Sequence, residues 1–255
     1  MTGITNHTIW IALGLTALAG LSTTIGSLIA VFYRTPGPKF MAFTMGFSAG
    51  VMILVSFVEL LGSSITSIGF GQAHLAFFTG FIVMLTIDYF TPHTYIMESN
   101  ITGGDGKLKK AAIFVALGIA IHNFPEGMVT FAGTLQNIDI GISLAVAIAI
   151  HNIPEGIAVA VPVYAVTRSA GKAFKWSFLS GVSEPVGAVL ALLVLMPILT
   201  EFVLGWMLAL VAGFMVFISL DELLPVATSY GEEHLPILGV ITGMGIMALS
   251  LYLII

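Results

Sequence analysis

The sequence predicts an all-α protein, a polytopic membrane bundle of eight transmembrane helices. Three observations predict this fold class: the composition, the length of the apolar segments and the placement of the basic residues. Of the 255 residues, 58% are hydrophobic and 8% are charged, whereas an ordinary soluble domain carries about 25% charged residues. A chain of this composition is expected in the cell membrane as a multi-pass protein, surrounded by the lipid bilayer.

The apolar segments have the length that a membrane helix needs. A helix crosses the hydrocarbon core in about 20 residues, and eight such segments follow one another with short connections. The expected spans are residues 8–33, 40–62, 73–90, 111–133, 141–164, 174–196, 203–224 and 236–255. We therefore expect one transmembrane domain that covers residues 1–255.

The basic residues predict the orientation of these spans. All of them follow the first, third or fifth span: Arg34, Lys39, Lys107, Lys109, Lys110, Arg168, Lys172 and Lys175. Because connections on the cytoplasmic side carry the excess of Lys and Arg, this side is predicted to be cytoplasmic. Both termini are then extracellular or periplasmic.

What the sequence lacks excludes cysteine chemistry and argues against transport driven by ATP. It contains no cysteine, so disulfides and thiolate metal ligands are ruled out. It also lacks a Gly-x-x-x-x-Gly-Lys-Ser/Thr loop, and its connections are too short for a nucleotide-binding domain, so transport driven by ATP is not expected within this chain. No nucleic-acid partner is expected either.

Two nearly identical motifs stand in the middle of apolar segments. They are His122-Asn123-Phe124-Pro125-Glu126-Gly127 and His151-Asn152-Ile153-Pro154-Glu155-Gly156. A histidine, an amide and a carboxylate are costly inside a membrane, and they indicate a functional site there.

Helix geometry explains why these residue types recur at this spacing. A helix advances about 100° per residue, so Glu126 projects between His122 and Asn123 on one face. The second motif repeats the arrangement, and two such helices packed face to face would offer two His, two Asn and two Glu to one space. This set suits one or two divalent cations bridged by the glutamates. Glu184 is expected at the same depth, as a third carboxylate near the midplane.

The predicted spans contain further acids but no Lys or Arg away from their ends. The seven acids are Glu59, Asp88, Glu126, Glu155, Glu184, Asp221 and Glu222. Each buried charge costs about 2.5–3.5 kcal/mol on insertion scales, and a cation can compensate that cost. The acids therefore indicate a route for cations, with Glu59 near the outer end and Asp88 and Glu222 near the inner end.

An internal repeat supports a carrier. Residues 49–61 resemble residues 212–224, with Ala-Gly at the start and Ser and Glu in phase. The two segments belong to spans that run in opposite directions, and inverted repeats are typical of carriers that expose a central site alternately to each side. Ser22, Thr23, Thr24, Gly26 and Ser27 are expected to let neighbouring helices approach closely.

On these residues the chain resembles the ZIP (Zrt/Irt-like protein) metal transporters, and most closely the bacterial ZupT-type zinc-uptake branch. The likeness runs from Gly20-Leu21-Ser22-Thr23 through both motifs and Val161-Pro162-Val163-Tyr164 to the stretch 219–225. It implies a 3+2+3 arrangement of the eight helices, a binuclear centre and uptake of divalent metal into the cytoplasm. It also suggests a homodimer.

The resemblance further implies two metal positions. The first uses His122, Glu126, His151 and Glu155, and the second uses Asn123, Glu126, Asn152, Glu155 and Glu184. Asp88 and His93 resemble a release path on the inner side, which Glu222 assists. The expected substrate is Zn²⁺, with Fe²⁺, Mn²⁺, Co²⁺ and Cd²⁺ as further candidates.

Two other classes remain open from the residues themselves. An intramembrane metal-dependent hydrolase would usually place a glutamate next to a ligand histidine, whereas Asn123 and Asn152 stand there. A cation channel or a proton-coupled antiporter could also use the string of acids. The sequence favours a transporter over an enzyme.

Overall fold

The computed structural model describes residues 5–33, 37–90, 120 and 123–254, and within them every regular element is a helix. The first half comprises α1 (Asn6–Tyr33), α2 (Pro38–Val55), the π-helical turn η1 (Ser56–Leu61), α3 (Gly62–Ile68) and α4 (Phe70–Phe90). A helix over residues 123–136 follows. The predicted all-α fold class is confirmed.

The second half is helical in the same way. It comprises α7 (Ile138–Thr167), α8 (Ala170–Leu190), η2 (Ala191–Leu195), η3 (Met196–Ile198), α9 (Glu201–Ile218), η4 (Ser219–Leu223), α10 (Leu224–Ser229) and α11 (Leu235–Ile254). Among the described residues, seven helices are long and apolar enough to cross a membrane. The remaining predicted span, 111–133, falls partly outside the described residues, and its end lies in the helix 123–136.

Polar side chains at the connections start the helices of the second half. The Asn137 side chain accepts a hydrogen bond from the Asp139 N–H at the start of α7, over 2.7 Å. Thr200 accepts from the Val203 N–H at the start of α9, over 3.1 Å. These side chains satisfy N–H groups that have no partner in the first turn of a helix. α7 then continues through Pro154 and Pro162 without ending.

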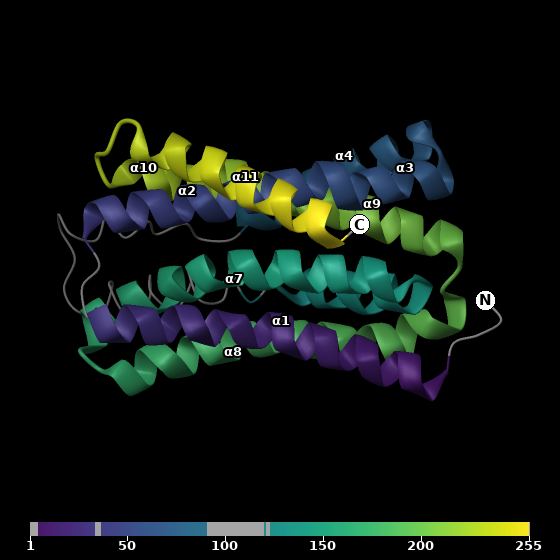
Figure 1. Cartoon of the computed structure of the whole chain (residues 1–255), viewed down its shortest axis with the longest axis horizontal. Helices are drawn as coiled ribbons and strands as arrows, with labels where there is room; N and C mark the ends of the chain where they lie inside the picture. Colours follow the sequence, from purple (N-terminus) through teal and green to yellow (C-terminus); the bar gives the residue numbers. More distant parts are fainter. Residues whose placement is uncertain (1–4, 34–36, 91–119, 121–122, 255) are drawn as a thin grey trace.

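The helices form two bundles that lie side by side (Figure 1). The first bundle contains α1, the helix 123–136, α7 and α8. The second bundle contains α2, α3, α4, α9, α10 and α11. Glycines bring backbones together within each bundle: a Cβ added to Gly20 on α1 would collide with the Gly181 carbonyl on α8.

The predicted repeat is visible in how the helices of the second bundle pair. A Cβ on Gly50 in α2 would collide with the carbonyl of Val240 in α11, and a Cβ on Gly213 in α9 would collide with that of Phe77 in α4. The distance along the sequence from Gly50 to Gly213 equals the distance from Phe77 to Val240, so the two contacts involve equivalent positions of the repeat. Equivalent glycines therefore meet equivalent residues, as a two-fold relation between the two halves requires.

Both copies of the repeat also contain a π-helical turn at the same place. η1 begins at Ser56 and η4 begins at Ser219. Each serine is buried, and each hydroxyl donates to the carbonyl four residues earlier, that of Met52 over 2.6 Å and that of Met215 over 2.7 Å. Hydroxyls bonded in this way often bend helices, and single π turns are frequent at functional sites.

Candidate metal centre

The first bundle buries six polar side chains within its helices. Asn123 and Glu126 lie on the helix 123–136, His151, Asn152 and Glu155 on α7, and Glu184 on α8. None of these side chains is more than 1% exposed. The structure thus brings into one bundle every ligand predicted from the sequence except His122, which lies outside the described residues.

The two motifs face each other through Glu126 and His151. The Nε2 atom of His151 lies 3.3 Å from Oε2 of Glu126, and its Nδ1 atom lies 3.0 Å from the Ala147 carbonyl. A carbonyl only accepts, so Nδ1 carries the proton, and a neutral ring then has its lone pair on Nε2. A lone pair and a carboxylate oxygen at this distance need a proton or a cation between them. With its proton on Nδ1, the neutral ring can bind a metal ion through Nε2.

Asn152 connects the motif to two neighbouring helices. Its Nδ2 group donates to the Ala19 carbonyl of α1 over 2.9 Å and also to Oε1 of Glu184 on α8. Both amide hydrogens are therefore used. Among the described residues, the Oδ1 atom of Asn152 has no hydrogen-bond partner, so it is available as an oxygen ligand.

Three of the predicted ligands have a buried oxygen atom without a hydrogen-bond partner among the described residues. These atoms are Oε1 of Glu126, Oδ1 of Asn152 and Oε2 of Glu184, all without a hydrogen bond within the part of the chain that the structure describes. Leaving such groups buried and unpaired is costly. Oxygen donors of this kind suit divalent cations.

The contacts among the described ligands are pairwise. Glu126 meets His151, and Asn152 meets Glu184. No three His, Asp or Glu side chains of the described ranges lie close enough to hold an ion by themselves. The predicted centre also uses asparagines and His122, and so the described carboxylates and His151 supply only part of its ligand set.

The described residues predicted along the pathway lie on helices of the second bundle or on the π turns that continue them. Glu59 lies in η1 and Glu222 in η4, at equivalent positions of the repeat, and both are half-buried. Asp88 is half-buried near the end of α4. His93 lies outside the described residues.

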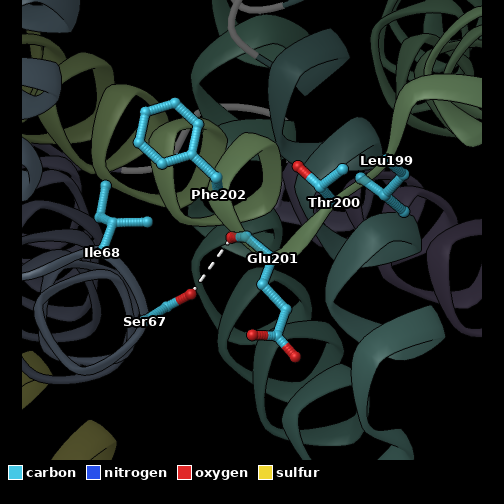
Figure 2. Close-up of a pocket in the computed structure, with 6 residues that line it drawn as sticks. All are labelled: Ser67, Ile68, Leu199, Thr200, Glu201 and Phe202. Atoms are coloured by element: carbon cyan, nitrogen blue, oxygen red, sulfur yellow. Dashed lines mark hydrogen bonds between the residues drawn. The ribbon is translucent and has the colours of Figure 1, made fainter.

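Two cavities lie outside the centre. One, of about 690 Å³, opens at the ends of α3 and α9, where the Ser67 hydroxyl donates to the Glu201 carbonyl over 3.1 Å and the Glu201 carboxylate points away from Ser67 (Figure 2). The other, of about 300 Å³, is lined by apolar residues of the helix 123–136 and α9, including Met128 and Met207. It separates part of the first bundle from the second.

Two hydroxyl-bearing residues beside the motifs were not predicted as part of the site: Ser48 was not singled out, and Thr23 was expected only as a packing residue. Ser48 of α2 donates to the His151 carbonyl over 3.3 Å. Thr23 of α1 is fully buried, and its backbone carbonyl lies where a Cβ on Gly156 would collide with it. Hydroxyls are common in apolar helices, so only the contact between helices distinguishes these two from ordinary packing residues.

A bundle of membrane-type helices that buries imidazole, amide and carboxylate groups defines a class of protein. It is a polytopic membrane protein with a cation site inside the bundle.

Comparison with known proteins identifies the family. The family model described as "ZIP Zinc transporter" matches residues 97–251. The chain is 48% identical to the zinc transporter ZupT of Chlorobium luteolum, over 95% of this chain and 97% of that protein. It is 44% identical to the ZupT of Stenotrophomonas maltophilia over 99% of both chains, and 48% identical to that of Streptococcus mutans over 94% and 96%.

The chain belongs to the ZIP zinc transporter family. The predicted resemblance is therefore confirmed, and with it a multi-pass membrane transporter rather than an enzyme.

Proposed function

We propose that this protein carries Zn²⁺ through the cell membrane into the cytoplasm and binds it between the helix 123–136 and α7. The observation that carries the proposal is the contact between His151 Nε2 and Glu126 Oε2, because it joins the two motifs through a pair of atoms that a cation would bridge. Fe²⁺, Mn²⁺, Co²⁺ and Cd²⁺ are further substrates for a site of imidazole, amide and carboxylate groups.

The centre holds two ions in this proposal. His122, Glu126, His151 and Glu155 hold the first, and Asn123, Glu126, Asn152, Glu155 and Glu184 hold the second. The unpartnered oxygens of Glu126, Asn152 and Glu184 support the second position. Glu126 and Glu155 belong to both sets, so they bridge the two ions.

Entry and release use the acids of the second bundle. Glu59 attracts the ion near the outer end, and Asp88, His93 and Glu222 guide it to the inner side. A membrane potential that is negative inside favours entry of a dication by about 4.6 kcal/mol per 100 mV, twice the value for one charge. The chain acts as one transmembrane domain, in the lipid bilayer and as a homodimer.

The rival classes differ from this proposal in measurable ways. A hydrolase needs a metal-bound water and an activating base, and the positions next to the histidines carry Asn123 and Asn152. A channel would pass ions without saturation. The curated relatives from Chlorobium luteolum and Stenotrophomonas maltophilia are named as zinc transporters.

Zinc uptake into proteoliposomes tests the proposal. We expect the wild type to take up Zn²⁺ with saturation, and His151→Ala with Glu155→Ala to abolish it. Glu233→Ala with His234→Ala is the matched control, because it removes the same residue types at exposed positions between α10 and α11. Flux that rises without saturation, or flux that persists in the His151 and Glu155 variant, would contradict a carrier with this site.

A further inference from the structure

The two-fold relation between the halves extends to α1 and α8, which cross beside the metal centre. Gly20 on α1 and Gly181 on α8 each lie where a Cβ would collide with the other's carbonyl. A Cβ on Gly26 would likewise collide with the carbonyl of Ile153, and one on Gly187 with that of Phe124. Ile153 and Phe124 hold the same place in the two motifs, so α1 meets α7 as α8 meets the helix 123–136.

This relation makes Thr23 the counterpart of Glu184. A Cβ on Gly20 would lie 3.2 Å from the Glu184 Cβ, and a Cβ on Gly181 would lie 3.2 Å from the Thr23 Cβ. The motif glycines agree, since Gly127 packs on the backbone of Glu184 and Gly156 on that of Thr23. Both side chains therefore start from equivalent points, which the two-fold relation between α1 and α8 places across its axis from each other.

The ligands of the second metal position are paired by this relation, with one exception. Asn123 pairs with Asn152 and Glu126 pairs with Glu155, but Glu184 has no carboxylate counterpart. An ion held by the two pairs lies near the two-fold axis, with Glu184 on one side. The side opposite Glu184 belongs to Thr23.

The Thr23 hydroxyl lacks the hydrogen bond to its own helix that a buried threonine usually makes. Buried threonines elsewhere donate to the carbonyl four residues earlier, as Thr16 does to Ala12 and Thr130 does to Glu126, both over 2.9 Å. Thr23 is 0% exposed, and its Oγ1 atom has no hydrogen-bond partner among the described residues. Leaving a buried hydroxyl without a partner costs free energy, and a bound water would supply the partner.

We propose that Thr23 holds a water molecule that occupies the coordination position opposite Glu184 around the second metal ion. The hydroxyl is closer to its backbone than a glutamate carboxylate is, so a water spans the remaining distance. The inference rests on the proposed function and deepens it, because it assigns a positioning residue to that centre.

A coordination position that is filled by a water molecule affects the binding of Mn²⁺ and Zn²⁺ differently. Mn²⁺ prefers octahedral sites of oxygen ligands, whereas Zn²⁺ is satisfied by four ligands. Thr23 therefore favours ions that need six ligands at the second position. It contributes little to zinc at the histidine-containing position.

Equilibrium metal binding to the purified full-length protein tests this assignment. Mn²⁺ and Zn²⁺ are titrated in competition with a fluorescent chelator. Thr23→Val keeps the shape of the side chain and removes the hydroxyl, and we expect it to weaken Mn²⁺ binding at the second position about tenfold, as loss of an outer-shell partner does. Zinc affinity at the first position stays unchanged, and Thr23→Ser restores Mn²⁺ binding.

Ser27→Ala is the matched control. Ser27 lies one turn from Thr23 on α1, is equally buried, and donates to the Thr24 carbonyl over 2.8 Å. We expect no change in metal affinity for this variant. An equal loss in Thr23→Val and Ser27→Ala would mean that α1 packing and not the hydroxyl is responsible, and would overturn the proposal.

Exchanging the two counterparts gives an independent test. Glu184→Thr should lose the second ion, and Thr23→Glu combined with Glu184→Thr should recover it, because the two positions are related by the two-fold axis. Unchanged first-site zinc affinity shows that each variant is folded. If the exchange fails and Thr23→Val binds Mn²⁺ with wild-type affinity, the inference about Thr23 is overturned. If the wild type binds no second ion, the two-ion scheme of the proposed function is overturned instead.

Discussion

Glu126 is the residue on which both metal positions depend. Its Oε2 contacts His151, and its Oε1 has no partner among the described residues. Glu126→Gln keeps the shape and removes the charge, and we expect it to weaken binding of both ions by about tenfold or more. Isothermal titration with Zn²⁺ measures this as a weaker affinity at both binding steps.

Asn152→Ala should separate the two positions. Asn152 bonds Glu184 and the Ala19 carbonyl and does not contact the His151–Glu126 pair through any hydrogen bond of its own. We expect the second binding step to disappear and the first to remain within about twofold, since its ligands keep their own contacts. Equal loss of both steps would contradict two separate positions.

The residue scale also shows what the sequence could and could not predict. The duplicated motif and the helical angle predicted that Glu126 and His151 serve one site, and the contact between them confirms that the motifs face each other. The role proposed for Thr23 was not predictable, because a threonine in an apolar helix usually bonds its own backbone. Its equivalence to Glu184 appears only when Gly20 and Gly181 are seen to meet.

At the scale of the element, glycine determines how closely α1 approaches α7. A Cβ on Gly26 would collide with the Ile153 carbonyl, and neither backbone can yield without moving its helix. Gly26→Ala is expected to destabilise the protein by about 1–3 kcal/mol, the usual cost of overpacking. Thermal unfolding followed by size-exclusion fluorescence in detergent measures the change.

Gly14→Ala on the same helix is the control for that prediction. Nothing lies within 4 Å of a Cβ at Gly14, so the substitution only removes the conformational freedom of a helical glycine. It should stabilise the protein by about 0.5–1 kcal/mol or leave it unchanged. Similar melting temperatures for the Gly14 and Gly26 variants would contradict the close approach of α1 and α7.

The same scale separates predictable helices from unpredictable irregularities. Apolar length predicted the seven spans found among the described residues, because each has at least about the length that the membrane core requires. The repeat of Ser and Glu between residues 49–61 and 212–224 predicted the internal symmetry. The π turns η1 and η4 were not predicted, since an inserted residue in a helix depends on packing around Ser56 and Ser219 and has no pattern in the sequence.

At the scale of the molecule, the two bundles are joined differently from the helices within each. Every collision that a Cβ on a described glycine would meet within 3 Å lies inside one bundle. Between the bundles, by contrast, the Ser48 hydroxyl of α2 reaches the His151 carbonyl of α7, and the apolar cavity of about 300 Å³ lies between the helix 123–136 and α9. Helices whose backbones are in close contact at glycines are expected to move together, so each bundle is expected to move as a unit during transport.

A cross-link between the bundles should therefore stop transport. The chain contains no cysteine, so Met128→Cys and Met207→Cys, on opposite sides of that cavity, provide the only thiols for a short bismaleimide. We expect the reagent to abolish saturable zinc uptake and to leave zinc binding intact, because each bundle keeps its own packing. Phe81→Cys with Phe217→Cys, whose native rings lie 5.3 Å apart within the second bundle, should transport equally before and after cross-linking. Unchanged uptake after the Met128–Met207 cross-link would show that the site changes its exposure without relative motion of the bundles.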